Sequence, residues 1–167
     1  MFSKFVKVLS VGLMMAGIGL LPVCSRADED YHPTRDGGNF GLGLELGDPG
    51  SWGVDGKLWL DSANAIQPAV KFNDGGPAIL QLDYLWHDYD VVRVQQGALP
   101  FYIGVGGDLV LQTSVTFAAR MPLGISYIFD KRNVPIDIYF QVVPTLWFYN
   151  TGATLDFYPE LGAHIYL

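Results

Sequence analysis

Apolar and polar residues alternate along the chain from Asn39 to Leu167, and the charged residues of the alternating stretches share the polar positions. Two of the clearest apolar series are Phe40, Leu42, Leu44, Leu46 and Leu80, Leu82, Tyr84, Trp86. Glu45 lies on the opposite side of the first series and Asp83 on the opposite side of the second. Residues two apart face the same side of a β-strand. The pattern therefore predicts a β-barrel that is apolar outside and polar inside, the reverse of a soluble barrel.

Eight alternating stretches are long enough to cross a bilayer as tilted strands. They are Asn39–Gly47, Gly53–Asp61, Ala65–Phe72, Ala78–His87, Leu99–Gly107, Val115–Phe129, Pro135–Phe148 and Leu155–Leu167. Pro68 cannot donate a ladder hydrogen bond, so we expect a bulge or local break there. The longest connection, 88–98, is expected outside the membrane on the side of the chain termini, with the residues 108–114 in a short loop on the other side. The predicted fold is an all-β, eight-stranded antiparallel up-and-down transmembrane barrel with a filled polar interior.

Aromatic residues gather at the ends of the predicted strands. Trp86, Phe101, Tyr127 and Phe129 are expected near one rim, and Phe72, Phe148 and Phe157 near the other. Membrane barrels carry aromatic girdles at both interfaces, so this distribution supports a membrane location.

The N-terminal region is set aside from the barrel. Lys4 and Lys7 precede an uncharged apolar run, and small residues follow at Ser25 and Ala27, which predicts a cleaved secretory signal peptide over 1–27. A membrane-spanning helix is the competing interpretation, but the run is shorter than the roughly 20 residues that a span requires. A lipoprotein signal ending at Cys24 is a second alternative. The acidic segment 28–38 is expected to be a polar lead-in, followed by the barrel over 39–167.

Composition excludes several classes of function. Cys24 is the one cysteine, so the mature chain has no disulfide, thiol nucleophile or cysteine metal ligand. The signal peptide contains three of the 10 Lys and Arg and none of the 17 Asp and Glu, which leaves the mature chain with a net charge of −10. Such an acidic chain is not expected to bind nucleic acid. Mean hydropathy is above zero, yet the mature chain has no apolar run near 20 residues, so any membrane crossing has to use strands.

The polar positions that are expected to face the lumen contain charges of both signs. They are Glu45, Asp55, Lys57, Lys71, Asp83, Arg120, Asp137, Gln141 and Glu160. An eight-stranded barrel has an interior that side chains fill, so these charges are expected to pair in a structural network. A gated ion path through the same residues is the alternative.

The best candidate catalytic set is Ser126, Asp137 and His164, which have the residue types of a nucleophile, an orienting carboxylate and a base. The set is disfavoured because one strand separates Ser126 from His164 and a filled lumen excludes substrate. His32 lies among acidic residues of the lead-in, where an acidic solvated tail explains it better than a cation site. Gly41, Gly43 and the glycines 104, 106 and 107 lie within strands, where close packing explains them better than a phosphate loop. No catalytic residue, cofactor or metal is expected.

Several segments carry a resemblance to a known family. They are Gly47-Asp48-Pro49, Gly56-Lys57-Leu58-Trp59-Leu60, Asp83 to Asp90, Leu99 to Gly107, Arg120 to Phe129 and Pro135-Ile136-Asp137. With these segments the chain resembles small OmpA-like outer-membrane barrels, among them a family of exported bacterial proteins of about this size. The resemblance covers nearly the whole mature chain and implies a fold, but no activity. Glu160, Gly162, Ile165 and Leu167 are also similar to the C-terminal signal that the barrel-assembly machinery reads.

These patterns together predict a bacterial outer-membrane protein with a structural or surface-interaction role in the cell envelope, and not an enzyme. The expected partners are outer-membrane lipid and, during biogenesis, the barrel-assembly machinery, and the protein is expected to be a monomer. A small ion or solute channel is the first alternative function and a lipid-modifying enzyme the second. A soluble lipocalin-like carrier is the alternative fold.

Overall fold

The computed structural model describes residues 39–47, 51–73, 75–92, 94, 96–111, 116–129, 136–149 and 151–167. The regular elements of these ranges are all β-strands, and none of the described residues belongs to a helix that is long and apolar enough to cross a membrane. The strands are β1 (Phe40–Leu46), β2 (Ser51–Trp59), β3 (Asn64–Asn73), β4 (Ile79–Asp88), β5 (Phe101–Val110), β6 (Thr116–Arg120), β7 (Leu123–Ile128), β8 (Ile136–Tyr149) and β9 (Gly152–Tyr166). The predicted signal peptide, the lead-in, Cys24 and His32 lie outside the described residues.

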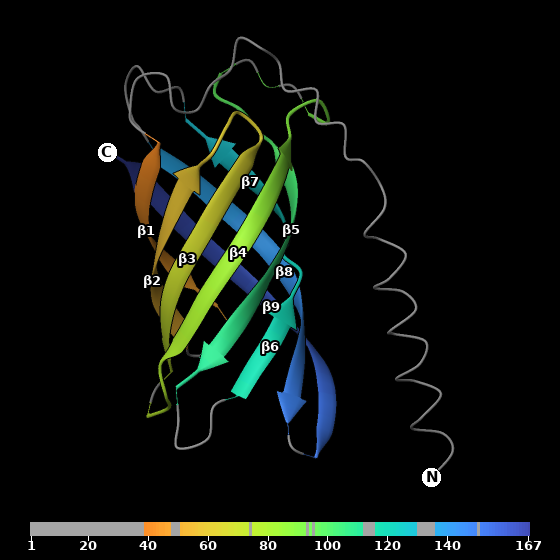
Figure 1. Cartoon of the computed structure of the whole chain (residues 1–167). Helices are drawn as coiled ribbons and strands as arrows, with labels where there is room; N and C mark the ends of the chain where they lie inside the picture. The colour runs from red at the N-terminus through yellow and green to blue at the C-terminus, as the bar shows by residue number, and fades with distance from the viewer. Residues whose placement is uncertain are drawn as a thin grey trace.

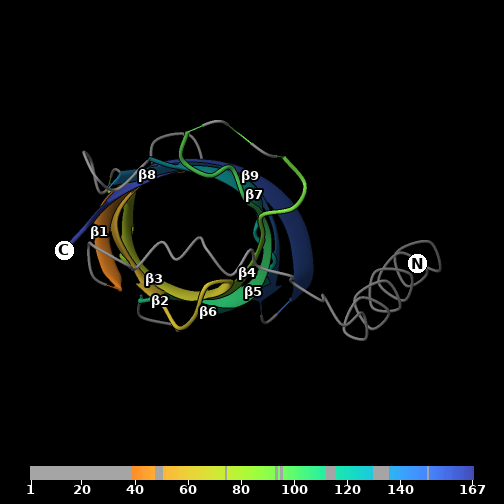
Figure 2. The ribbon, with the colours of Figure 1, turned by 90° about the horizontal axis from the view of Figure 1, so that it is seen from above.

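The strands form one closed antiparallel barrel, which Figure 2 shows as a ring seen along its axis. Neighbouring strands along the chain pair with each other, except that β6 and β7 both pair with β5 and with β8. β1 pairs with β9, and the pairing of β4 with β5 completes the ring. The paired residues can be followed from a residue of β1 through each strand in turn and back to β1. The path ends about ten residues away from its starting residue, and this stagger requires strongly tilted strands. The tilt is visible in Figure 1.

β6 and β7 are two parts of one strand. Both pair with β5 and β8, and the register against each neighbour is the same before and after the interruption at Met121 and Pro122. Pro122 has no N–H to donate to the ladder, which explains the interruption. Its carbonyl still accepts from Gly104 N at 2.8 Å. The nine segments therefore make an eight-stranded barrel, and the predicted fold class is confirmed.

Alternation along each strand divides the side chains between the lumen and the outer surface. The outward positions carry large exposed apolar side chains, such as Leu44, Leu82 and Phe157. The inward positions carry buried polar and charged side chains, such as Glu45, Asp83 and Glu160. A soluble barrel has the opposite arrangement, because its apolar side chains leave water by pointing inward.

The two ends of the barrel differ in their connections (Figure 1). At the end that we call the turn side, short connections join β1 to β2, β3 to β4, β5 to β6 and β8 to β9. At the other end, which we call the loop side, β1 begins, β9 ends, and the long connection between β4 and β5 crosses. The long connection and the ends of the barrel domain thus share one side, as the sequence predicts.

Pro68 interrupts a ladder without forming a bulge. On the β2 side, Gly56 and Lys57 have no paired residue opposite Gln67 and Pro68, but the register is unchanged on either side of the gap. On the β4 side Pro68 remains paired with Leu82. Of the two expected alternatives, a bulge or a local break, the structure has the local break, because a missing donor removes a hydrogen bond without requiring an extra residue.

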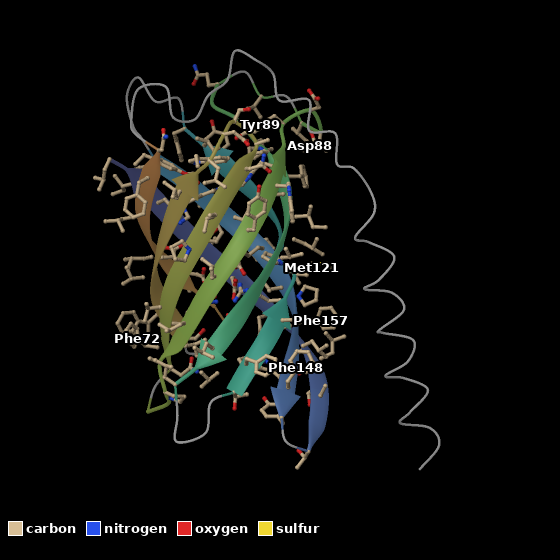
Figure 3. All side chains as sticks on the ribbon, viewed as in Figure 1. Phe72, Asp88, Tyr89, Met121, Phe148 and Phe157 are labelled. Carbon is tan, nitrogen blue, oxygen red and sulfur yellow. The ribbon has the colours of Figure 1, made fainter. Side chains whose placement is uncertain are left out.

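The aromatic residues lie at the expected rims. Phe72, Phe148 and Phe157 are near the turn side (Figure 3). At the loop side Tyr84 lies against Trp86 and Tyr127 against Phe129, with ring centroids 4.7 and 4.8 Å apart. Such bands are what an interfacial girdle requires.

Candidate functional site: the charged lumen

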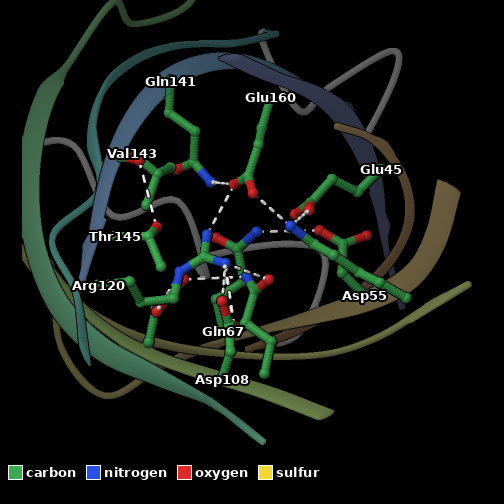
Figure 4. A network of polar contacts seen from close by, with 12 residues as sticks. Glu45, Asp55, Gln67, Asp108, Arg120, Gln141, Val143, Thr145 and Glu160 are labelled. Carbon is green, nitrogen blue, oxygen red and sulfur yellow. Dashed lines mark hydrogen bonds and ion pairs between the residues drawn. The ribbon is translucent and has the colours of Figure 1, made fainter. Parts of the chain in front are cut away.

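The nine polar residues that the sequence places on the inward side all lie in the lumen, and none is more than 6% exposed. They come from seven of the nine segments, β1, β2, β3, β4, β6, β8 and β9. Figure 4 shows several of them meeting across the barrel. Because their backbones lie on opposite walls, only closure of the barrel brings these side chains together.

Arg120 is the centre of the polar contacts on the turn side. Its Nη2 donates to Glu160 Oε2 at 2.7 Å, and its Nη1 donates to Gln81 Oε1 at 2.5 Å. Its Nε lies 3.1 Å from Asp83 Oδ1. Asp108 is a third carboxylate partner, whose oxygens lie 3.2 and 3.4 Å from Nη1. A planar guanidinium with five N–H groups can serve several carboxylates at once, as it does here.

Lys71 joins two further carboxylates to this group by forming ion pairs with Glu45 and Glu160. Gln141 donates to Glu160 Oε2 at 2.5 Å and accepts from the Tyr102 hydroxyl at 2.8 Å. We call the charged members the turn-side cluster, which comprises Glu45, Lys71, Asp83, Asp108, Arg120 and Glu160. Four carboxylates face two cations in this cluster.

A second cluster lies nearer the loop side and comprises Asp55, Lys57, Asp137 and His164. We call it the loop-side cluster. His164 Nδ1 lies 2.7 Å from Asp137 Oδ1, and its Nε2 lies 2.8 Å from Asp55 Oδ2. Ionised carboxylates only accept, so this geometry favours a ring that is protonated on both nitrogens. Lys57 Nζ donates to Asp137 Oδ2 at 3.3 Å. In that state two cations balance two carboxylates.

Tyr139 links the two clusters. Its hydroxyl oxygen lies 2.8 Å from Glu45 Oε2 and 2.7 Å from Asp55 Oδ2. Gln67 donates from Nε2 to Asp55 Oδ2 and to the Tyr139 hydroxyl, both at 3.0 Å. A phenol has one proton to donate, so Tyr139 can serve only one of the two carboxylates at a time. The lumen thus contains one continuous chain of polar contacts.

Glycines make room for the buried groups. A Cβ on Gly106 would overlap Asp83 Oδ1, and a Cβ on Gly43 would overlap Asp55 Oδ1 and the His164 ring. Gly162 similarly accepts the ring of Tyr139 against its backbone. These contacts explain the strand glycines by close packing, as expected from the sequence.

The two mouths of the lumen differ. On the loop side, Trp59, Ala98, Ile128 and Tyr166 form a buried apolar cluster against which Tyr89 packs. Ala98 belongs to the long connection and is held by reciprocal backbone hydrogen bonds with Ile128 at 2.9 and 2.8 Å. This cluster covers the loop-side mouth. On the turn side a cavity of about 120 Å³ opens above the turn-side cluster.

The candidate catalytic set does not assemble. His164 and Asp137 are in contact, but the second ring nitrogen of His164 faces Asp55 rather than Ser126. Ser126 Oγ is buried and has no hydrogen-bond partner within the described part of the chain. The arrangement orients no nucleophile. Among the described residues, no three His, Asp or Glu side chains are placed to hold a metal ion.

Asp108 is the charged lumen residue that the sequence interpretation missed. It was expected in a loop over 108–114, but β5 continues to Val110, so Asp108 is buried in the lumen. Continuing the alternation of Gly104 and Gly106 by one step would have placed it there. His87 is also fully buried, with Nδ1 3.1 Å from the Ala63 carbonyl and no partner for Nε2 among the described residues.

The four residues of the expected assembly signal lie at the end of the chain, two facing the lumen and two on the outer surface. Glu160 and Gly162 face the lumen, where Glu160 binds Lys71 and Arg120. Ile165 and Leu167 are exposed on the outer surface. Contacts within the lumen thus account for Glu160 and Gly162, whereas Ile165 and Leu167 point away from the lumen.

No protein-family model matches the chain, and no curated protein matches it either. Among solved structures, the chain is similar to the N-terminal β-barrel domain of Pseudomonas aeruginosa OprF, with 14% sequence identity and a TM-score of 0.53. The match covers 78% of this chain and 99% of the OprF domain. At this identity the likeness shows the fold, a closed eight-stranded barrel. Membership of the OmpA-like family stays a prediction from the sequence.

Proposed function

We propose that this protein is an outer-membrane β-barrel with a structural or surface-interaction role in the cell envelope. One observation carries the proposal, namely that the barrel is apolar outside and charged inside. Leu44, Leu82, Val105 and Phe140 each expose about half of their side chain or more to the surroundings. A closed barrel of this polarity suits lipid, because closure leaves no open sheet edge and the apolar band faces hydrocarbon.

Two further observations support this location. Aromatic side chains collect at both ends of the apolar band, where a girdle is expected. The fold also resembles that of the OprF barrel domain. Lipid is the expected partner, and the exposed pair Ile165 and Leu167 is consistent with recognition by the barrel-assembly machinery. We propose that the protein is a monomer.

The packed lumen favours a structural role over a channel. The contacts of Arg120, Lys71 and Tyr139 cross the lumen from wall to wall, and the cluster around Trp59 covers the loop-side mouth. Recording in planar bilayers tests this proposal. A plugged barrel gives no discrete conductance, whereas openings that disappear on neutralising Arg120 or Glu160 would support the channel instead. We find no observation that favours the lipid-modifying enzyme.

Substitutions at two depths test the membrane location directly. Leu82 lies midway along β4, and Leu60 follows the end of β2 at the rim; they are 57% and 50% exposed. In a bilayer, Leu82→Lys is expected to cost about 2–4 kcal/mol and Leu60→Lys about 0–1 kcal/mol, because the penalty depends on depth. Unfolding by urea in lipid vesicles measures both.

A soluble barrel would tolerate both substitutions equally, since both side chains would already face water. Equal stability of the two variants, together with recovery of the wild-type protein from the soluble periplasmic fraction, would overturn the proposal. Recovery in the outer-membrane fraction is the expected result.

A further inference from the structure

The turn-side cavity has a charged floor and an aromatic wall. Its volume is about 120 Å³, and it is lined by Lys71, Asp108, Arg120, Trp147, Tyr158 and Glu160, among others. These six residues come from five strands, β3, β5, β6, β8 and β9, which enclose a cavity only in the closed barrel. Side chains of the lumen form the cavity, and lipid would contact only the outer surface of the barrel. A test of what the cavity binds is therefore independent of a test of the membrane location.

The two cations that line this cavity, Lys71 and Arg120, also pair with Glu45 and Asp83, two carboxylates that do not line it. The turn-side cluster contains four carboxylates but only Lys71 and Arg120 as cations, whereas the loop-side cluster is balanced when His164 is protonated. Buried charges are costly unless they are paired. The excess negative charge lies beside the one of the two mouths that is not covered by the Trp59 cluster.

Asp108 is the least satisfied of the carboxylates that line the cavity. Within the described residues its hydrogen bonds are the two from Arg120, which are long at 3.2 and 3.4 Å. Glu160, by contrast, receives bonds from Lys71, Arg120 and Gln141. A carboxylate has about four acceptor positions, so Asp108 can accept further donors from a molecule in the cavity.

The remaining lining of the cavity includes aromatic and apolar side chains, namely Ile79, Trp147 and Tyr158. Trp147 packs with Val110 and Ala118, and Ile79 and Tyr158 lie against them. Trp147 Nε1 donates to the Tyr158 hydroxyl at 3.1 Å, which fixes the two rings relative to each other. The face of an indole or phenol ring attracts cations, whereas a strongly hydrated metal ion gains little from an apolar wall.

We propose that the turn-side cavity binds a small organic cation, a guanidinium or alkylammonium head group that donates hydrogen bonds to Asp108 and lies against Trp147 and Tyr158. The excess of carboxylates over cations in the turn-side cluster favours a cation over an anion. The aromatic side chains favour an organic cation over a metal ion. A cavity of about 150 Å³ accommodates benzene. A cavity of 120 Å³ therefore suits a compact head group whose chain extends into the open mouth.

Titration of the folded full chain in detergent micelles tests the proposal. Agmatine is the probe and succinate the anionic control, with binding followed by calorimetry and by the indole N–H signals in an assigned NMR spectrum. We expect agmatine to bind and to shift the Trp147 signal while that of Trp59, at the other mouth, stays in place. Succinate is expected to do neither.

Variants identify the residues that hold the cation. Asp108→Asn keeps the shape of the cavity and removes one charge, so the dissociation constant for agmatine should rise about tenfold or more. Trp147→Leu should raise it severalfold, because it removes the aromatic face. Asp88→Asn is the matched control, since it removes the same charge near the loop-side mouth and should leave affinity unchanged.

The inference is wrong if agmatine neither releases heat nor shifts the Trp147 signal of the wild-type protein. It is equally wrong if succinate binds as well as agmatine, or if folded Asp108→Asn keeps wild-type affinity. Absence of binding would indicate that protons, and not a ligand, neutralise the excess carboxylates. The wild-type titration decides the matter even where a variant does not fold.

Discussion

The two clusters of the lumen differ in how their buried carboxylates are compensated. In the loop-side cluster, His164 and Lys57 balance Asp55 and Asp137, and the apolar cluster that contains Trp59 and Tyr166 separates them from solvent. In the turn-side cluster, two cations serve four carboxylates beneath an open cavity. Where charges are balanced the mouth is covered, and where they are not, the mouth gives access to water or a ligand.

The clusters also distribute their contacts differently. Arg120 alone contacts three carboxylates, so much of the turn-side cluster depends on one side chain. In the loop-side cluster each carboxylate has several donors: Asp137 receives bonds from Lys57, His164 and Tyr166. The difference predicts that the turn-side cluster is more sensitive to a single substitution. Three substitutions test this comparison, in order of decreasing effect, and a fourth, outside both clusters, gives a reference for an exposed charge.

The largest effect is expected from Arg120→Met. It replaces the partner of Asp83, Asp108 and Glu160 by an apolar side chain of similar length. The buried carboxylates are then left without a compensating charge. The free energy of unfolding should fall by about 3–5 kcal/mol. Urea unfolding in micelles measures the loss, and Arg120→Lys, which keeps the charge, should recover part of it. A loss below that of the loop-side substitution described next would contradict the comparison.

His164→Leu is expected to have a smaller effect, a loss of about 2–3 kcal/mol. It deprives Asp55 and Asp137 of one donor each, but Tyr139, Gln67, Lys57 and Tyr166 remain. The same urea experiment compares it with Arg120→Met. Lys57→Met on the His164→Leu background should cost more than it does in the wild-type protein, since Asp137 would then lose two donors.

Gly106→Ala tests the close packing beneath the turn-side cluster. The added methyl group would overlap Asp83 Oδ1 and the Leu82 carbonyl, so we expect a loss of about 1–3 kcal/mol. Gly107→Ala is the matched control, because position 107 is on the outward side of β5 and its Cβ would meet only the Ala118 carbonyl at 3.1 Å. Comparable losses for the two variants would show that the methyl group does not disturb Asp83.

The smallest effect concerns Asp61, which lies in the β2–β3 turn beyond both clusters. Partial burial tends to raise the pKa of its carboxyl, but hydrogen bonds from Asn64 and from the Ala63 N–H outweigh this, and the pKa is lowered. The ionised carboxylate of Asp61 therefore stabilises the protein at neutral pH. This contribution is lost as the pH falls through the lowered pKa of the carboxyl. Asp61→Ala should cost about 1 kcal/mol at pH 7.

The measurement is the difference in unfolding free energy between wild type and Asp61→Ala as a function of pH. The difference should shrink in acid. A difference that stays constant down to strongly acidic pH would show that the turn does not depend on the charge of Asp61.

Much of the fold follows from the alternation of apolar and polar residues along each strand. The prediction is wrong where residues typical of turns lie within a strand. The inward and outward sides were predicted correctly through β6 and β7, although Pro122 divides that strand in two. The end of β5 was placed too early, because Asp108 after two glycines looks like a turn. Its side chain lies in the lumen, where Arg120 of the neighbouring segment β6 compensates its charge.

The sequence by itself determined that this chain forms strands with one apolar and one polar face, since a period of two is a property of each strand alone. It also determined which charges lie inside, with the exception of Asp108. The pairing of those charges was decided by the tertiary structure, because closure and stagger bring Lys71 of β3 to Glu160 of β9, and His164 of β9 to Asp55 of β2. The unequal balance of the two clusters, and the cavity above one of them, exist only once the barrel is closed.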